Sequence, residues 1–303
     1  MASRLEAARR PPGPHPECPP PPAHQPAPRR VKVPPGAVDC HCHVIGGPPS
    51  HPYVETRSYT PQPAWPDAYV AMLDATGMTY GVLIQVSAHG SDNSLMLQAI
   101  ADHPKRLKGI AVAPLGLPAR EYQALKDGGV TGLRLNVMFG GGYGLEQLDQ
   151  YDALCADLGW HLQFLIDTPN LVAAATRLSK LKSSFVVDHM AYVETPKGVA
   201  DPAFQTLVSL VRDGGWVKVS GAYRWSEDGA LPYADTIPFA QALLAAAPDR
   251  CVWGSDWPHV THWAHMMTVA DLIDLLADWA PDEALRHKVL VDNPAVLYGF
   301  PPP

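Results

Sequence analysis

The sequence predicts a single (β/α)₈ barrel preceded by a proline-rich arm, and three observations support this fold. Eight short apolar runs between residues 37 and 257 alternate with amphipathic segments of helical period. The runs are apolar almost throughout, as expected for parallel strands that are buried on both faces. Gly-Gly pairs at 128–129 and 214–215 follow two of the helical segments, where a left-handed C-terminal cap is favoured.

The elements can be followed along the chain. Residues 1–35 are rich in proline and carry few periodic apolar residues, so we expect a disordered or loosely wrapped arm. The barrel is expected over residues 36–303, and each of its strands is followed by a helical segment. The strands are predicted at 37–44, 80–87, 108–115, 132–137, 161–167, 184–189, 216–221 and 251–257.

A doubly wound open sheet is the alternative fold. Such a sheet would carry a glycine-rich nucleotide-binding turn after its first strand, and "HVIGGPPSHP" lacks the G-x-G-x-x-G pattern. The run "FGGGYG" at 139–144 has no following Lys-Ser/Thr pair, so it is not a phosphate-binding loop. We interpret it as a flexible loop over the mouth of the barrel.

Composition narrows the classes of function. The net charge is −7 and there is no basic run, which argues against nucleic acid as a partner. No stretch approaches the length of a membrane span, and the N-terminus lacks the apolar core of a signal peptide. The five cysteines are irregularly spaced, which favours free thiols in a reducing compartment. We therefore expect a cytoplasmic enzyme, as a monomer or homodimer, with no membrane segment.

The first predicted strand contains alternating histidines and cysteines, "VDCHCHV" at 38–44. Alternate residues of a strand share a face, so His41 and His43 point the same way and Cys40 and Cys42 point the other way. Histidines near the carboxyl end of a barrel strand lie at the mouth, where barrel enzymes place their active sites. Alone, His-x-His is equally consistent with a partly exposed pair that has no role.

Other predicted strands also end in polar residues. These residues are Ser87, Arg134, His189, Arg224, Asp256 and His259. An uncompensated buried Asp or Arg is costly, so the set indicates a functional site rather than packing. We expect Asp188, the neighbour of His189, to face away from the lumen, because adjacent strand residues face opposite ways.

The order of these motifs resembles the amidohydrolase superfamily and, more narrowly, the 2-pyrone-4,6-dicarboxylate lactonase group. The resemblance lies in "PPGAVDCHCHV", "SYTP", "QVSAHGSDN", "GLRLN", "VVDHM", "WGSDWPH" and "VDNPAVLYGF", from about residue 34 to 300. It implies a lactonase that opens a carboxylated pyrone or muconolactone ring in the degradation of aromatic compounds. The catalytic set it implies is Asp256, His41, His43 and His189. Substrate contacts are implied for Tyr59, Ser87, Arg134, Arg224 and His259.

Two positions depart from the pattern of the pyrone-dicarboxylate enzymes. Gly140 stands where those enzymes look to have a second Arg, and Leu165 stands where they look to have a Tyr. A substrate with two carboxylates needs two cationic partners. The departures therefore predict a different arrangement of acid groups on the substrate, unless Arg224 and His89 compensate.

The resemblance leaves two alternatives for a metal. A binuclear site would need a bridging Lys on the fourth strand and a His near the mouth on the fifth, and the sequence has neither. A single divalent ion such as Zn²⁺ could be held by His41, His43 and Asp256, with water as the fourth ligand. We favour the metal-free alternative, in which no cofactor is required.

The expected mechanism is the attack of water on the lactone carbonyl. Asp256 would act as general base, and the histidines would donate hydrogen bonds to the carbonyl oxygen. Three other functions stay open: a metal-dependent decarboxylase, a lactone isomerase and a non-catalytic acid-binding barrel. The decarboxylase needs a bound metal, the isomerase differs in its product, and binding alone needs no general base.

Overall fold

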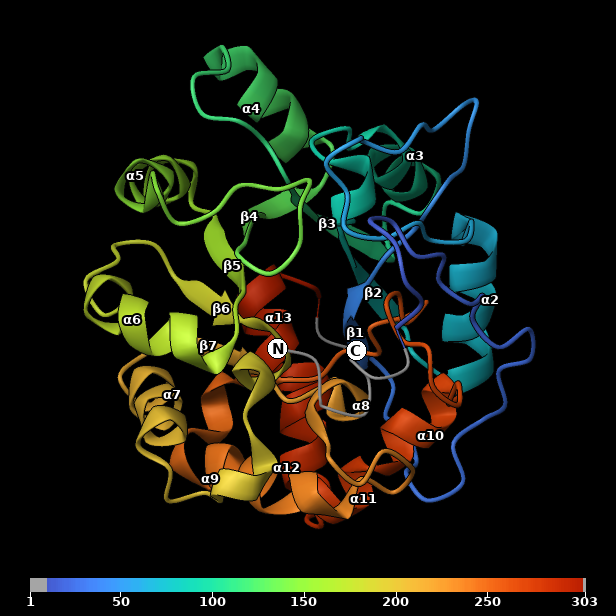
Figure 1. The fold of residues 1–303 in the computed structure, drawn as a ribbon, viewed down its shortest axis with the longest axis vertical. Coiled ribbons are helices and arrows are strands. Elements are labelled where there is room, and N and C mark those ends of the chain that lie inside the picture. The colour runs from blue at the N-terminus through green and yellow to red at the C-terminus, as the bar shows by residue number, and fades with distance from the viewer. Residues whose placement is uncertain (1–9, 302–303) are drawn as a thin grey trace.

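The computed structural model describes residues 10–301 and has the architecture of a parallel barrel (Figure 1). Eight strands form one sheet in which each strand pairs with the next along the chain, all of them parallel. The strands are β1 Val38–Cys42, β2 Tyr80–Ile84, β3 Leu107–Ala111, β4 Val130–Asn136, β5 His161–Leu165, β6 Phe185–Val187, β7 Trp216–Lys218 and β8 Cys251–Val252. The (β/α)₈ prediction is confirmed.

Helices lie between the strands in sequence and surround the sheet (Figure 1). They are α2 Pro66–Thr76, α3 Ser94–Asp102, α4 Ala119–Asp127, α5 Leu148–Leu158, α6 Thr168–Leu178, α7 Pro202–Arg212, α8 Ala222–Trp225 and α9 Ile237–Ala246. After β8 follow α10 Val269–Asp274, α11 Leu276–Trp279, α12 Glu283–His287 and α13 Asn293–Tyr298. Within the described part of the chain, none of these helices has the length and apolar character that a bilayer crossing requires.

The barrel closes where β1 meets the segment after β8. Three backbone hydrogen bonds of 2.7, 2.8 and 3.0 Å join β1 and His43 to residues 253–257, and the shortest runs from the Asp256 N–H to the His41 carbonyl. A Cβ at Gly254 would come within 2.5 Å of the His41 Cβ, so only glycine permits this approach. The closure therefore brings the end of β8 directly against the histidines of β1.

Asp39 reinforces this closure from inside the core. Its side chain is 0% exposed and accepts hydrogen bonds from the Ser255 backbone N–H (2.7 Å) and hydroxyl (2.6 Å). The Tyr69 hydroxyl on α2 donates to the same carboxyl group at 3.1 Å. Burial raises the pKa of Asp39 to about 6, which these donors only partly offset. One carboxyl group thus links β1, α2 and the segment after β8.

All eight strands end before the boundary that the sequence predicts, and the last three illustrate the cause. The predicted strands 184–189, 216–221 and 251–257 extend beyond the observed ends of β6, β7 and β8. After β6, residues 189–192 have φ between 49° and 55°, and Asp256 has φ 59°. A left-handed conformation cannot continue a strand, so the chain leaves the sheet here. The predicted boundaries were wrong because the residues at the barrel mouth take up turn conformations.

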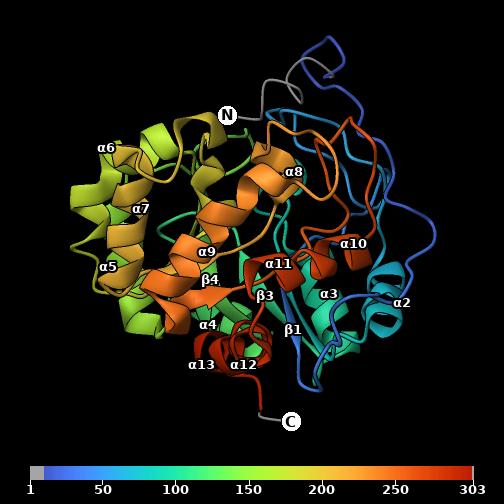
Figure 2. The same ribbon diagram turned by 90° about the horizontal axis from the view of Figure 1, so that it is seen from below.

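Residues 10–35 lie against the barrel and run past α2 to the start of β1 (Figure 2). Cys18 is 3% exposed, and its N–H donates to the Thr60 carbonyl at 2.8 Å. Three consecutive backbone N–H groups, at residues 29–31, donate to the carboxylate of Asp274 on α10 at 2.8 to 3.0 Å. The first nine residues of the predicted arm lie outside the described residues. The division into arm and barrel at residue 35 stays a prediction.

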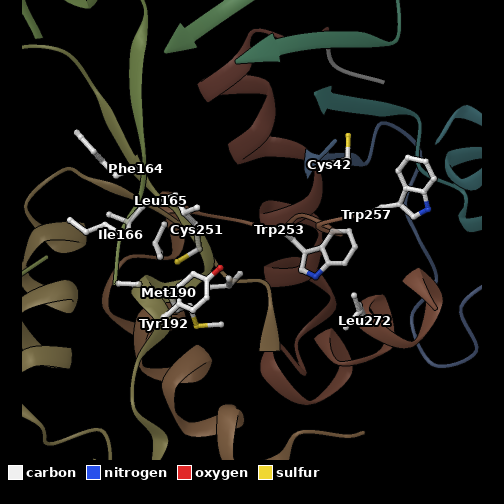
Figure 3. Close-up of a cluster of buried hydrophobic side chains, with 14 of the residues drawn as sticks. Cys42, Phe164, Leu165, Ile166, Met190, Tyr192, Cys251, Trp253, Trp257 and Leu272 are labelled. Atoms are coloured by element: carbon white, nitrogen blue, oxygen red, sulfur yellow. The ribbon is translucent and has the colours of Figure 1, made fainter. Parts of the chain in front are cut away.

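Large apolar side chains fill the space between the strands and the helices (Figure 3). Trp253 and Trp257, on either side of the turn at Asp256, are both almost fully buried. Figure 3 shows Leu272 of α10 near them, and Met190 and Tyr192 near the ends of β5 and β6. The turns that carry the polar residues are therefore held by apolar packing.

Replacing Asp39 by Ala should lower the free energy of unfolding by about 3 kcal/mol, because several buried donors lose their acceptor. Urea unfolding followed by tryptophan fluorescence measures the change. The control is Asp74→Ala, which removes an exposed ion pair with Arg106 (2.8 Å) and should change stability by less than about 1 kcal/mol. Equal effects of the two substitutions would contradict the role of Asp39 in closing the barrel.

Candidate active site

Four side chains predicted from the sequence converge at the carboxyl ends of the strands. His41 lies in β1, and His43 follows it directly; His189 follows β6 and Asp256 follows β8. The Nε2 atoms of His41 and His43 each lie 3.7 Å from Asp256 Oδ1. The Nε2 atom of His189 lies 3.6 Å from Asp256 Oδ2. The structure thus brings the four residues together, while their catalytic role stays a prediction.

The two carboxylate oxygens of Asp256 differ in their hydrogen bonds. Oδ2 accepts hydrogen bonds from the Tyr223 hydroxyl (2.6 Å) and from Nε of Arg224. Oδ1 is buried and has no hydrogen-bond partner among the described residues. The residue also has φ 59°, a strained conformation for a non-glycine residue that is common at functional sites. The surroundings therefore fix the carboxylate and present Oδ1 to the histidines.

The electrostatics of the site keep this carboxylate ionised. Burial alone would raise the pKa of Asp256, but the charge of Arg224, together with His189 and His41, holds it well below its ordinary value. Burial lowers the pKa of His43 to about 3 and that of His189 to about 4. Burial also lowers the pKa of His41 well below its ordinary value. Near neutral pH the site therefore holds a carboxylate and neutral imidazoles.

Arg224 uses all of its nitrogen atoms within the protein. Besides the Nε contact with Asp256, one terminal nitrogen donates to the Thr261 hydroxyl and the other to the Val260 carbonyl, both at 3.1 Å. These contacts use three of the five N–H groups of the guanidinium and tie it to Asp256 and to residues 260–261. The geometry favours a role in holding Asp256 over the substrate contact that the resemblance implies.

A small cavity of about 10 Å³, with room for about one water molecule, lies beside Asp256. It is lined by His43, Tyr59, Ser87, Arg134, Phe139, Leu165, His189, Tyr192, Arg224, Asp256 and Val260. In its wall, the Tyr59 hydroxyl and Ser87 Oγ are hydrogen-bonded at 3.0 Å. Arg134 is 5% exposed, and its Nε has no partner among the described residues. Arg134 therefore has a buried nitrogen that no protein group in the described part of the chain satisfies.

Two other histidines considered from the sequence are not among the described residues that line this cavity. His259 is buried against Tyr223, with its Nδ1 3.3 Å from the hydroxyl that donates to Asp256. The ring of His89 packs against the ring of Tyr53, with centroids 5.5 Å apart. Within residues 10–301 the structure therefore shows no direct path from His259 to the cavity, and an effect of His259 on the substrate would pass through the Tyr223 hydroxyl.

Of the two departures from the pyrone-dicarboxylate pattern, Leu165 lines this cavity and Gly140 lies in the loop beside its wall residue Phe139. Leu165 is buried in its wall and gives an apolar surface. The Gly140 N–H donates to Ser58 Oγ at 2.9 Å, and a Cβ at this position would come within 2.0 Å of the Thr56 carbonyl oxygen. No side chain fits at position 140 in this loop, so the loop supplies no second cation there.

A second polar group lies deeper in the barrel, and the sequence analysis missed it. Lys218 of β7 is fully buried, and its Nζ lies 2.8 Å from Gln163 Oε1 and 3.3 Å from Asp188 Oδ1. The expectation that Asp188 faces away from the lumen was wrong: Val186 pairs with Gln163 on the lumen face, so alternation places Asp188 on that face too, and His189 reaches the site through its positive φ of 49°. A lysine within the apolar run "WVKVSG" is a signal that could have identified Lys218.

The site also has the donors for one divalent cation. One ligand atom from each of His41, His43 and Asp256 lies within 4.8 Å of the others. His43 Nδ1 donates to the Ile84 carbonyl at 2.8 Å, so its Nε2 turns a lone pair toward Asp256. The Nε2 atom of His41 and Oδ1 of Asp256 have no partner among the described residues. Two imidazoles and a carboxylate form an ordinary ligand set for catalytic zinc.

The family model described as amidohydrolase matches residues 38–300. The chain belongs to the amidohydrolase family. A relative from Rhizobium radiobacter, named 4-sulfomuconolactone hydrolase, is 38% identical over 279 residues, which cover 90% of this chain and 93% of the relative. A 2-pyrone-4,6-dicarboxylate hydrolase from Comamonas testosteroni is 33% identical over 287 residues, with coverage of 90% and 93%.

A solved structure of similar fold comes from Acinetobacter baumannii. It is described as a probable 2-pyrone-4,6-dicarboxylic acid hydrolase with citric acid bound, and it is 32% identical to this amidohydrolase. The superposition has a TM-score of 0.77 and covers 88% of this chain and 100% of the other. These comparisons confirm the resemblance on which the sequence analysis relied.

Replacing Arg224 by Met should lower kcat of this amidohydrolase by about 10²-fold, because the carboxylate loses its strongest partner. The same change raises the pKa of Asp256, so the acid limb of the kcat/KM profile should move to higher pH. The control is Arg120→Met on the exposed surface, which should change neither quantity. A rise in KM alone, with an unmoved acid limb, would instead identify Arg224 as a substrate contact.

Proposed function

We propose that this protein is a lactonase that hydrolyses the ring of a carboxylated pyrone or muconolactone-type compound formed in the breakdown of aromatic molecules. One observation carries the proposal: Asp256 Oδ1 has no hydrogen-bond partner among the described residues and lies 3.7 Å from Nε2 of both His41 and His43. A distance of 3.7 Å between a nitrogen and a carboxylate oxygen is longer than a direct hydrogen bond, and a water molecule can bridge the two atoms. The relatives named as lactone hydrolases support the class of substrate.

Asp256 acts in this reaction as the general base. The water oxygen forms a bond to the lactone carbonyl carbon while one water proton passes to Oδ1. Because the pKa of Asp256 is low, the protonated carboxyl group readily gives this proton to the ring oxygen as the carbon–oxygen bond breaks. The products are a carboxylic acid and a hydroxyl group on one opened chain.

Neutral imidazoles stabilise the negative charge that develops on the carbonyl oxygen. His189 is oriented by a hydrogen bond of 2.9 Å between its Nδ1 and Ser220 Oγ, and its Nε2 faces the cavity side of Asp256. His41 lies in ring contact with His189, with centroids 4.4 Å apart. Each preorganised donor aimed at the developing charge contributes about 10²-fold or more to the rate.

The remaining wall of the cavity orients the substrate. Arg134 has the unused donor that a substrate carboxylate needs, and the hydroxyls of Tyr59 and Ser87 lie in the same wall. Phe139 and Leu165 offer apolar surface to the lactone ring. A carboxylate fixed by a guanidinium converts a random encounter into an aligned attack by water.

The proposed reaction uses only side chains of this chain, and no cofactor is required. If a zinc ion were held by His41, His43 and Asp256, it would supply a water of lowered pKa. We further propose a cytoplasmic protein that acts on a small-molecule carboxylate lactone as a monomer or homodimer.

Asp256→Asn should reduce kcat by about 10³-fold while the fold and the affinity for substrate are kept, because the amide cannot accept the proton from water. Acid release on ring opening, measured with 2-pyrone, muconolactone and sugar-acid lactones, gives the rates. Asp213→Asn, an exposed carboxylate on the surface, is the matched control and should behave as the wild type. A wild-type rate in Asp256→Asn would remove the base from the mechanism.

Analysis of the products and of the metal content separates the other candidate functions. A hydrolase incorporates one oxygen from ¹⁸O-labelled water into the product, whereas a lactone isomerase forms a new lactone without the label. A decarboxylase of this superfamily releases carbon dioxide and contains a stoichiometric metal, which elemental analysis of the purified protein detects. A barrel that only binds acids shows none of these products.

A further inference from the structure

A buried polar cluster lies under the catalytic residues and connects β1, β5, β6 and β7. Its members are His41, Gln163, Asp188 and Lys218, and each is fully buried. Asp188 Oδ2 accepts from the Gln163 amide at 3.1 Å and from Arg134 at 3.5 Å. No step of the proposed reaction uses Lys218, yet a lysine buried at 0% exposure is costly unless it has a specific role.

The neighbours of Lys218 show that its amino group acts as a donor. Nζ lies 2.8 Å from Gln163 Oε1 and 3.3 Å from the carboxylate of Asp188, and these oxygens can only accept. An ammonium group has three hydrogens and no lone pair. The third atom within reach is Nδ1 of His41, at 3.1 Å. Asp188 Oδ1 lies farther from Nδ1, at 3.3 Å, so the geometry favours a lone pair on Nδ1 that accepts from Lys218.

We propose that Lys218 is a positioning residue that donates a hydrogen bond to His41 Nδ1 and thereby keeps the ring proton of His41 on Nε2. The role rests on the proposed lactonase function. The Nε2 atom of His41 lies 3.7 Å from Asp256 Oδ1 and has no partner among the described residues. Its N–H is therefore free to donate to the carbonyl oxygen of the substrate.

The two histidines of the His-x-His motif then have opposite tautomers. The Ile84 carbonyl can only accept, so His43 carries its proton on Nδ1 and turns the Nε2 lone pair toward Asp256. His41 carries its proton on Nε2 instead. One ring thus donates to the substrate, while the other accepts from the attacking water. This arrangement favours the metal-free alternative, because a nitrogen that ligates a metal needs a lone pair.

Asp188 provides the alternative that Lys218 excludes. Its Oδ1 lies 3.3 Å from His41 Nδ1 and would accept a hydrogen bond from a protonated Nδ1 if Lys218 were absent. The His41 ring would then carry its proton on Nδ1, and Nε2 would lose the hydrogen that the reaction needs. The structure therefore predicts that removal of the Lys218 donor changes the tautomer of His41.

The test compares the wild type with Lys218→Met and Lys218→Gln, whose side chains are equally long and differ in the amide group. Long-range ¹H–¹⁵N NMR spectra of the full chain labelled with ¹⁵N-histidine report which ring nitrogen carries the proton. A His41→Gln spectrum assigns the His41 signals. Steady-state kinetics on the hydrolysed lactone then give kcat and KM for the three proteins.

The wild type should show His41 protonated on Nε2, and Lys218→Met should show it protonated on Nδ1. The Met variant should lose about 10²-fold in kcat with KM changed less than about twofold, because a transition-state donor is lost. Lys218→Gln should keep the wild-type tautomer and recover most of kcat, since its amide can donate to Nδ1. Equal losses in both variants, with an unchanged tautomer, would mean that Lys218 only balances the charge of Asp188.

The wild-type spectrum decides the inference even if a variant fails to fold. A wild-type His41 ring protonated on Nδ1 overturns it, whatever the activity. Absence of lactone hydrolysis by the wild type would instead contradict the proposed function, and the tautomer of His41 would still be measured. The two failures are therefore distinguishable.

Discussion

The pairing of β1 with the segment after β8 is the contact on which the rest of the structure depends. It closes the sheet, and the same hydrogen bond that joins the Asp256 N–H to the His41 carbonyl (2.7 Å) sets the distance between the two side chains. The Asp39 carboxyl group and the absence of a side chain at Gly254 make this approach close. The contact that closes the barrel therefore also assembles the candidate site, because it joins residues 40–43 to residues 253–257.

Closure also explains why so many charges can lie inside the barrel. Lys218, Arg134 and Arg224 face Asp188 and Asp256 at distances of 3.5 Å or less, so each buried charge has an opposite charge beside it. Buried pairs seldom add to stability, because desolvation offsets their attraction. Their contribution is orientation. The charged contacts hold these side chains in place, so that in the proposed reaction the site meets the substrate without reorganising.

The sequence predicted the fold and most of the site because both depend on regular periods. Alternating apolar runs and amphipathic segments indicate the barrel, and polar residues at strand ends indicate its mouth. The prediction failed where the period ends. Asp188 continues the alternation from Val186 and faces the lumen, whereas His189 reaches the site only because residues 189–192 take positive φ. Such turns depend on packing around Met190 and Tyr192, which come from the tertiary structure and leave no local pattern.

Arg224 shows why a residue's role cannot be read from its position alone. The resemblance implies a substrate contact, and the side chain does line the cavity, yet its three nitrogens are bound to Asp256, Thr261 and Val260. A general base of low pKa is a weak proton acceptor, which costs reactivity toward water. The same low pKa makes protonated Asp256 a strong acid toward the leaving oxygen. In the proposed reaction, the Arg224 contact therefore makes proton abstraction harder, and stabilisation of the carbonyl oxygen by the histidine donors becomes the larger contribution.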